Sequence, residues 1–330
     1  MYEKIIIHDD FDGIISGAIC SVALGVRKII FAGPSAIIRS IVSISENDIV
    51  CDLPYPLECA LWFDHHEGNL QDLEFRKIAP ADINGRFAPL KSCARVVYEY
   101  FSERTNLPEF IQDTVEEADI IDSFGYSSIE EWRMETPGKI IDSTLKIKEQ
   151  SRQKRESYMR ELLYLLKDNS IEEVANLQMV KERFNRYKKD EEGMLKIIRD
   201  SSNCISMEGN SKIVLLDLTD YNRRPVLIKN LAYLLFPNSS AVLQIVNLFE
   251  RGTKTTDLSF SMSLSLKHDT TQFDINIGEI MRTLNIGDGH RGAGAGIVSC
   301  NSKQEMIKKK AIITDKIFRL WNAQISIGSH

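Results

Sequence analysis

A short apolar run gives way to charged and imidazole side chains at Trp62-Phe63-Asp64-His65-His66-Glu67-Gly68. Apolar runs of this kind are typical of buried strands. Two earlier runs end in the same way. Lys4–His8 leads into Asp9-Asp10-Phe11-Asp12-Gly13, and Asp48–Cys51 leads into Asp52. Strands that alternate with helices predict an α/β domain with a mainly parallel sheet, and ligands bind beyond the carboxyl ends of such strands. The three polar turns are therefore predicted to form one site.

The chain divides into three segments that differ in residue composition and in predicted secondary structure. Residues 1–140 also contain a predicted strand at Lys28–Ala32 and predicted helices at Ile14–Leu24, Ser92–Arg104 and Phe110–Ser123. Ser143–Arg199 is rich in Lys, Arg, Glu and Leu and has no glycine until Gly193, which predicts two or three amphipathic helices. We interpret residues 141–200 as a helical connector with a solvated face. A lid or a dimer contact is the alternative.

Residues 201–330 are predicted to form a second, smaller α/β domain. Ser259–Leu266 alternates polar and apolar residues, as a half-buried strand does. The other predicted elements are strands at Lys212–Leu218 and Ala241–Phe249 and helices at Pro225–Leu235 and Asn276–Leu284. We therefore expect two α/β domains joined by helices.

Composition and charge narrow the class of protein. The chain has 330 residues, 43% hydrophobic and 27% charged, which is typical of globular domains. Its apolar runs are too short to span a bilayer, and its first residues lack a secretory signal. The six cysteines form no C-x-x-C pair, as expected of buried thiols in a reducing compartment. We therefore predict a cytoplasmic protein without a membrane partner. The net charge of −6 argues against broad binding of long nucleic acids and leaves room for a short anionic substrate.

The turn after the first run holds His8, Asp9, Asp10 and Asp12. Carboxylates this close repel one another unless a cation lies between them, and oxygen ligands suit Mg²⁺ and Mn²⁺. Capping of the following helix by Asp12 is the alternative. A calcium loop of the EF-hand type is excluded, because no glutamate stands at the twelfth position. Asp52 likewise has two alternative interpretations, as a metal ligand or as a turn residue.

Further candidates are imidazoles and paired carboxylates. Of His65 and His66, one is suited to bind an ion while the other donates to a substrate phosphate. Asp119 and Asp122 lie three residues apart on a predicted helix and so share one face, either in the site or exposed to solvent. His268 and His330 have no such context, and we interpret them as surface and tail residues.

The glycine-rich segment Gly287–Gly296 contains His290 and Arg291. Backbone amides without intervening side chains approach a polyanion closely, and arginine suits phosphate geometry. The segment is neither a Walker loop nor a dinucleotide fingerprint, because no Gly-Lys-Ser/Thr follows and it comes late in the chain. A tight turn is the alternative.

In this order the motifs resemble those of the DHH family of phosphoesterases. The matching pieces are His8–Gly13, Asp52, the name-giving Asp64-His65-His66, Asp119 or Asp122, and Gly289–Gly294 as the Gly-Gly-His motif of the family's C-terminal substrate domain. The resemblance covers nearly the whole chain except Ser143–Arg199. The spacing of His8 is similar to that of the nano-RNase and RecJ-like branches. Asp288 stands where the family commonly has glycine, and we expect it to weaken anion binding unless it faces away or pairs with Arg291.

The resemblance implies two α/β domains with the active site between them, and two Mn²⁺ or Mg²⁺ ions. It implies that the metal ligands are Asp10, Asp12, Asp52 as the bridge, His65 and the fourth-motif aspartate, with His8 as a further candidate. For that aspartate we favour Asp119, which follows Ala118, over Asp122. The resemblance assigns catalysis to Asp52 and His66 and substrate binding to Gly289, His290, Arg291 and Gly292.

The predicted function is metal-dependent hydrolysis of phosphodiester bonds in short oligonucleotides or small nucleotides. Two ions that share a water lower its pKa and aim it at phosphorus. A phosphatase acting on a bisphosphorylated nucleotide, polyphosphate or pyrophosphate is one alternative, and a nucleotide-binding protein with a degenerate metal site is another. A homodimer is among the expected assemblies.

Overall fold

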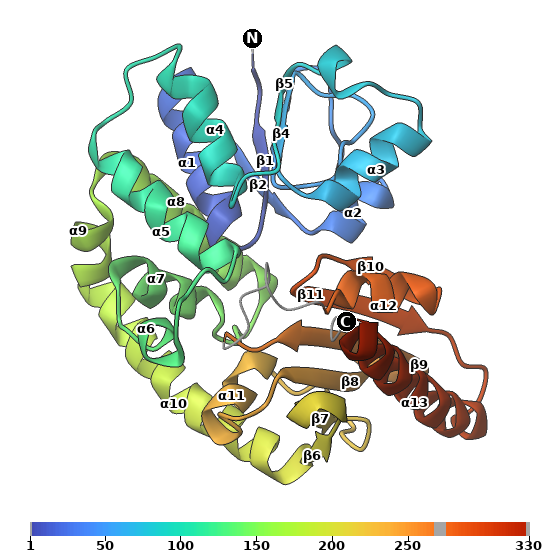
Figure 1. Cartoon of the computed structure of the whole chain (residues 1–330). Helices are drawn as coiled ribbons and strands as arrows, with labels where there is room; N and C mark the ends of the chain where they lie inside the picture. Colours follow the sequence, from blue (N-terminus) through green and yellow to red (C-terminus); the bar gives the residue numbers. More distant parts are fainter. Residues whose placement is uncertain (1, 267–274, 328–330) are drawn as a thin grey trace. The chain divides into compact units, whose positions relative to one another are not determined.

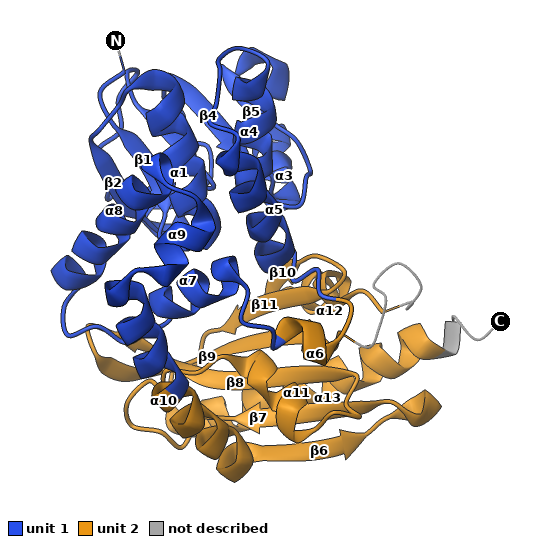
Figure 2. Ribbon diagram, turned by 90° about the vertical axis from the view of Figure 1, so that its left-hand side faces the viewer, with its two compact units in different colours: residues 1–126, 133–188 blue, residues 127–132, 189–330 orange. Residues whose placement is uncertain are grey.

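The computed structural model describes residues 2–266 and 275–327, so His268 and His330 lie outside the described residues. The chain divides into two compact units (Figure 2). Unit 1 comprises residues 1–126 and 133–188, and unit 2 comprises residues 127–132 and 189–330. The helical segment predicted at 141–200 is therefore divided between the units after Lys188.

Unit 1 is built on a five-stranded parallel sheet of order β2-β1-β3-β4-β5 (Figure 1). This confirms the predicted parallel α/β architecture. The strands are β1 (Ile5–His8), β2 (Ile29–Ala32), β3 (Ile49–Cys51), β4 (Leu61–Asp64) and β5 (Gly85–Phe87). The helices up to the unit boundary are α1 (Phe11–Leu24), α2 (Pro34–Ile38), α3 (Glu67–Phe75), a 3-10 turn η1 (Pro80–Asp82), α4 (Cys93–Ser102), α5 (Phe110–Asp122), α7 (Pro137–Leu145), α8 (Arg152–Asp168) and α9 (Ile171–Asn176).

Helices cover both faces of this sheet. Ile5 and Ile7 of β1 point to one face and pack in a core with α1, α4 and α8, whereas Ile6 points to the other face and packs near α2 and α3. A parallel sheet that is buried on both faces has nearly continuous apolar strands, which explains the isoleucine run. Leu162 and Leu163 of α8 are fully buried in the first core, so the charged helical segment supplies part of the core of unit 1.

The strand order reverses at β1. The chain passes from β1 to β2 on one side and then to β3 on the other side of β1. Connections that leave in opposite directions open a crevice at the carboxyl ends of β1 and β3, which is where ligands bind in such sheets. His8 ends β1, and Asp52 follows β3 directly.

Unit 2 contains a six-stranded mixed sheet of order β10-β11-β9-β8-β7-β6, in which β7 and β8 are parallel. Its apolar face, including Phe260 and Met262, packs against α12 and α13. The strands are β6 (Ser202–Ser206), β7 (Lys212–Asp217), β8 (Ala241–Glu250), β9 (Thr253–Leu264), β10 (Gly287–Gly289) and β11 (Ala293–Val298). The helices are α6 (Ile129–Trp132), α11 (Ala232–Leu235), α12 (Ile277–Thr283) and α13 (Lys303–Ile327), with 3-10 turns η2 (Glu208–Asn210) and η3 (Lys229–Leu231), and α10 (Gln178–Ser201) runs across the unit boundary.

Two predictions for unit 2 are corrected. The helix expected at Pro225–Leu235 begins only at Lys229, because no regular structure forms around Pro225. The glycine-rich segment Gly287–Gly296 is not an open loop but an antiparallel hairpin of β10 and β11. A Cβ atom at Gly289 would lie 2.3 Å from the carbonyl oxygen of Ala293, so the glycine permits close strand packing.

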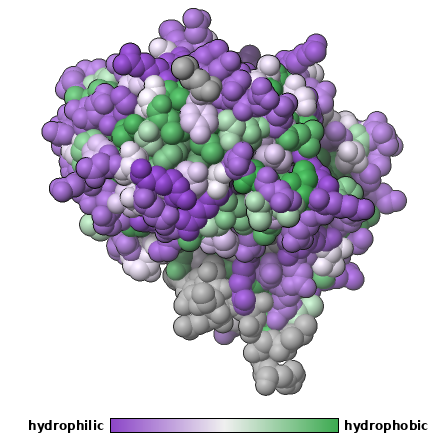
Figure 3. Space-filling view, turned by 90° about the horizontal axis from the view of Figure 1, so that it is seen from above, coloured by the Kyte–Doolittle hydropathy of each residue, from purple (hydrophilic) through white to green (hydrophobic). Residues whose placement is uncertain are grey.

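The described surface carries hydrophobic residues in small groups among hydrophilic ones on the face drawn in Figure 3. Among the described residues, no helix has the length and apolar character needed to cross a membrane.

Candidate metal centre

The three polar turns predicted from the sequence meet at the carboxyl ends of β1, β3 and β4. Backbone geometry is unusual at two of these turns. Asp52 has a φ of 60°, in the left-handed region that costs energy for a residue with a side chain. A Cβ atom at Gly13 would lie 2.3 Å from the carbonyl oxygen of His8, so only glycine fits there. The close approach at Gly13 lets the first turn of α1 pack directly against the end of β1.

One group of potential ligands consists of His8, Asp10 and Asp52. Nδ1 of His8 lies 2.6 Å from Oδ2 of Asp10 and 3.3 Å from Oδ2 of Asp52. Burial lowers the pKa of His8, but its hydrogen bonds with these two carboxylates outweigh burial and raise the pKa to about 11. Without an ion, a proton on His8 thus supplies the positive charge that faces the carboxylates of Asp10 and Asp52.

A second group consists of Asp12, His65 and Asp122. Nε2 of His65 lies 3.4 Å from Oδ2 of Asp122, 3.8 Å from Oδ2 of Asp12 and 3.7 Å from Oδ1 of Asp52. The two oxygens of Asp52 therefore face different groups, since Oδ2 lies nearer to His8.

Asp10, and not Asp12, caps helix α1, because its Oδ1 accepts a hydrogen bond of 2.9 Å from the amide of Gly13. Asp12 lies in the first turn and is held by another helix. Its two oxygens accept hydrogen bonds of 2.7 Å from the amides of Cys93 and Ala94, at the amino end of α4. The partial positive charge of a helix amino end stabilises a buried carboxylate.

Three carboxylates of the cluster have raised pKa values, whereas burial raises the pKa of Asp10 but its hydrogen bond with His8 outweighs burial and lowers it. Burial and the charge of Asp10 raise the pKa of Asp52 to about 7, and the same two causes raise that of Asp122 to about 7. Burial and the charges of Asp52 and Asp122 also raise the pKa of Asp12. Carboxylates crowded in this way are stabilised in their charged form by a cation.

The residues present fit a divalent ion. Nδ1 of His65 lies 3.0 Å from the carbonyl oxygen of Leu90, which fixes the tautomer with a free lone pair on Nε2. Burial, followed by the charge of His66, lowers the pKa of His65, so the imidazole is neutral. Nε2 of His65 and Oδ1 of Asp52 are buried and have no hydrogen-bond partner among the described residues. Carboxylates with an imidazole form a donor set suited to Mn²⁺ and also to Mg²⁺.

His66 has a different environment from His65. Its Nδ1 lies 2.9 Å from Oδ1 of Asp64, and about half of the side chain is exposed. Burial lowers the pKa of His66, but the hydrogen bond with Asp64 and its charge outweigh burial and raise the pKa to about 9. His66 also forms a third group of potential ligands with Asp52 and His65, since its Nδ1 lies 3.6 Å from Oδ1 of Asp52. Its raised pKa makes it a charged donor within the cluster.

Asp119, the favoured fourth-motif ligand, lies outside the cluster. Its Oδ1 accepts a 2.6 Å hydrogen bond from the hydroxyl of Ser92, and its Oδ2 accepts a 2.8 Å bond from Nε of Arg95. Asp122 instead belongs to the second ligand group. The two residues are three positions apart on α5, but helix rotation turns them to different neighbours.

The predicted substrate-binding residues lie in unit 2. His290, Arg291 and Gly292 form the turn between β10 and β11, and the side chains of His290 and Arg291 are exposed. Asp288 pairs with Arg282 rather than with Arg291.

Four supporting contacts were not predicted from the sequence. Three are hydrogen bonds: between Asp64 and His66, between the carbonyl of Leu90 and His65, and between the α4 amides and Asp12. The fourth is an ion pair between Asp9 and Arg155 of α8. Asp9 belongs to none of the groups of potential ligands among the described residues. The last three contacts join segments that are distant in sequence, so no local sequence signal indicates them, whereas Asp64 and His66 are only two positions apart.

The sequence matches no protein-family model and no curated protein. The pGpG-specific phosphodiesterase PggH from Vibrio cholerae is similar over 95% of this chain and 98% of its own, with a TM-score of 0.67 and 24% identity. The DHH domain of a member of the s1p family of ribosomal proteins is similar over 97% of this chain and 87% of its own, with a TM-score of 0.59 and 12% identity.

The chain has the fold of the DHH phosphoesterases. The resemblance drawn from the motifs is thus confirmed for the fold. RecJ from Thermus thermophilus, solved in complex with Mn²⁺, shares the DHH fold over 96% of this chain, with a TM-score of 0.54 and 14% identity. The match spans 52% of the RecJ chain, so about half of that protein has a counterpart here.

Proposed function

We propose that the chain is a hydrolase of phosphoester bonds that works with two divalent ions, Mn²⁺ or Mg²⁺. The observation that carries the proposal is the position of Asp52 between two ligand groups, with one oxygen 3.3 Å from His8 and the other 3.7 Å from His65. Two bound ions would supply a water of lowered pKa and neutralise charge on phosphoryl oxygens.

Each of these two ligand groups is assigned to one ion. His8, Asp10 and Asp52 would hold one ion, and Asp12, His65, Asp122 and the shared Asp52 would hold the other. Hydrogen bonds from the α4 amides hold Asp12, and the carbonyl of Leu90 holds His65. These contacts would keep the carboxylate of Asp12 and Nε2 of His65 directed at the second ion.

His66 is assigned to the substrate. Its ring is held by Asp64, charged below a pKa of about 9 and half exposed, so Nε2 is available to donate to a phosphoryl oxygen. His290 and Arg291, flanked by Gly289 and Gly292 on the β10–β11 hairpin, are assigned to the phosphate or terminal nucleotide of the substrate.

The proposed substrates are short oligonucleotides or small nucleotides. Three observations support this class: the net charge of −6, the DHH fold, and the similarity along the whole chain to a phosphodiesterase specific for pGpG. The proposal includes a protein without a membrane partner that acts in the cytoplasm.

A hydrolysis panel tests the proposal. The full chain is incubated with Mn²⁺ or Mg²⁺ and with pGpG, a short RNA, a cyclic dinucleotide, adenosine 3′,5′-bisphosphate or polyphosphate. We expect metal-dependent release of nucleotides from pGpG or the RNA, abolished by Asp52→Ala. Activity on polyphosphate alone would overturn the nucleotide assignment, and no hydrolysis of any substrate together with no metal uptake would overturn the enzyme.

A further inference from the structure

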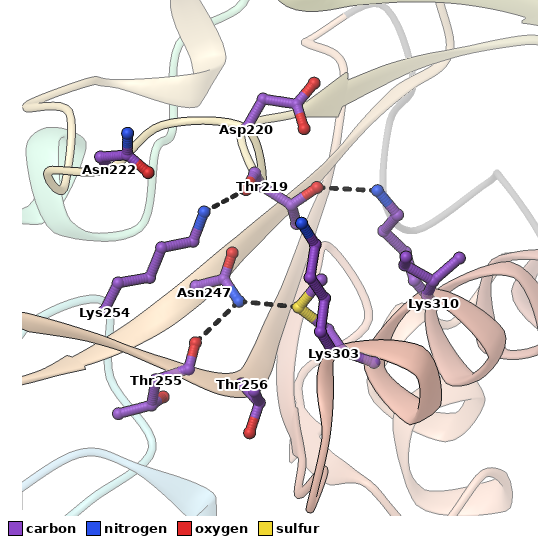
Figure 4. A pocket seen from close by; sticks show the side chains of 11 residues that line it. Thr219, Asp220, Asn222, Asn247, Lys254, Thr255, Thr256, Lys303 and Lys310 are labelled. Atoms are coloured by element: carbon purple, nitrogen blue, oxygen red, sulfur yellow. Dashed lines mark hydrogen bonds between the residues drawn. The ribbon is translucent and has the colours of Figure 1, made fainter.

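Unit 2 contains a pocket of about 370 Å³ that shares no residue with the metal centre of unit 1 (Figure 4). The volume falls in the range of small-molecule sites, about 300–1,000 Å³. The pocket opens where β7 ends, beside the β8–β9 hairpin, and is closed by one face of α13. Its side chains include Thr219, Asn247, Lys254, Lys303, Met306 and Lys310. Because β7 and β8 are parallel, the pocket again lies near the carboxyl end of a parallel strand.

The pocket carries excess positive charge. Of its three lysines, Lys310 donates 2.7 Å hydrogen bonds to Oδ2 of Asp217 and to the hydroxyl of Thr219. Within the described ranges, Lys254 donates to the backbone carbonyl of Thr219, at 2.5 Å, and to no other group. Neither Lys254 nor Lys303 has a carboxylate partner among the residues that the structure describes. The carboxylate in the lining, Asp220, is exposed. Two ammonium groups with unused donors therefore remain for an anion.

A buried acceptor points to a ligand with donor groups as well. Asn247 is 2% exposed, and its Oδ1 is buried without a hydrogen-bond partner in the described part of the chain. The amide orientation is fixed, because Nδ2 donates a 3.0 Å hydrogen bond to the carbonyl of Thr255, which cannot donate in return. Figure 4 shows Oδ1 turned away from Thr255, on the side of Thr219 and Lys254. A buried acceptor left unpaired destabilises the pocket, and a hydroxyl or amine donor of a ligand would restore the missing hydrogen bond.

This pocket is separate from the hairpin assigned to the substrate. The amide of Leu264 bonds to the carbonyl of Gly292, which places the hairpin turn at the carboxyl end of β9. Thr255 and Thr256 of the pocket lie near the amino end of the same strand. At about 3.4 Å per residue the two places are roughly 30 Å apart along β9.

We propose that this pocket is a second anion-binding site that takes a small phosphorylated ligand the size of a nucleoside monophosphate. Lys254 and Lys303 bind its phosphate, and Asn247 accepts a hydrogen bond from a hydroxyl or amine of the same molecule. Met306 and Ile307 supply apolar surface for the rest of the ligand. Binding here requires no hydrolysis.

Isothermal titration calorimetry of the full chain with adenosine monophosphate tests the site. We expect a binding event that the double variant Lys254→Gln/Lys303→Gln weakens about tenfold or more, since each charged hydrogen bond contributes about 1.5–3 kcal/mol. The control is Lys308→Gln, which removes one lysine charge from α13 outside the pocket and should leave binding unchanged. Thermal unfolding of all three proteins checks that the fold is retained.

Three results would overturn the site. These are the absence of binding to the wild-type chain at millimolar ligand, unchanged binding in the double variant, which would put the nucleotide at the metal centre, and equal weakening by Lys308→Gln. Inorganic phosphate serves as the second probe and should bind more weakly than adenosine monophosphate, because it leaves the Asn247 acceptor unpaired. The titration does not measure turnover, so a failure of the proposed hydrolase activity would not alter its outcome.

Discussion

The turn after β1 and the β10–β11 hairpin both combine glycine with charged side chains, but their charged side chains differ in burial and in partners. In the β1 turn Asp12 is buried, and it crowds against Asp52 and Asp122 from other segments. In the hairpin the glycines allow the two strands to pack closely, and exposed Arg282 forms an ion pair with Asp288. Crowded buried carboxylates are costly unless a cation joins them, whereas glycines and exposed charges have ordinary structural explanations. The first pattern is therefore the stronger sign of chemistry.

The largest expected effect of a single change is at Asp52. Asp52→Ala removes the residue shared by both ligand groups, and we expect turnover to fall by about 10³-fold or more, since it weakens both ion sites at once. Metal-dependent hydrolysis measured with saturating Mn²⁺ checks this. The matched control is Asp9→Ala, in the neighbouring turn, whose carboxylate is held by Arg155 and should matter far less. Equal losses in the two variants would contradict the ligand assignment.

A comparison of Asp122 with Asp119 sharpens the account of α5. Asp122→Asn should weaken Mn²⁺ binding and lower turnover by about 10–100-fold, as loss of one ligand does. Asp119→Asn should instead lower the free energy of unfolding by about 2–3 kcal/mol, because it breaks a charged hydrogen-bond pair with Arg95. Metal titration and urea unfolding separate the two effects. Loss of metal affinity in Asp119→Asn with unchanged stability would reverse the assignment.

The stabilising effect of Mn²⁺ should grow with pH. The folded-state pKa values of Asp52 and Asp122, both about 7, lie above the ordinary carboxyl value, so folding takes up protons between about pH 4 and 7. The metal-free chain therefore loses stability as pH rises through that window, and His8 acts in the same direction above about pH 6.5. Bound ions replace these protons. We expect the Mn²⁺-induced rise in Tm to be larger at pH 8 than at pH 5.5, and a rise independent of pH would contradict this.

The smallest effect is expected in the hairpin. Asp288→Ala removes an ion pair with Arg282 whose partners are both nearly half exposed, and such pairs contribute about 0–1 kcal/mol. The free energy of urea unfolding should change by less than about 1 kcal/mol, and turnover with saturating substrate should stay within about twofold. A large fall in turnover would place Asp288 in the chemistry.

The sequence predicted the sheet of unit 1 and the place of its site, because isoleucine-rich runs that end in polar turns define parallel strands and their carboxyl ends. It favoured Asp119 as the fourth-motif ligand, whereas the structure places Asp122 in a group of potential ligands and pairs Asp119 with Ser92 and Arg95. Spacing on a helix gives a shared face but not the partners of each side chain. The sequence also could not reveal that α4 amides hold Asp12 or that Leu90 fixes His65. Those contacts depend on tertiary packing between distant segments.

Anomalous X-ray diffraction at the manganese edge, on crystals of the full chain grown with Mn²⁺, tests the central claim most directly. We predict two manganese peaks, one beside His8, Asp10 and Asp52 and one beside Asp12, His65 and Asp122, with Asp52 contacting both ions. A single ion, or ions bound elsewhere such as beside Asp119, would contradict the account.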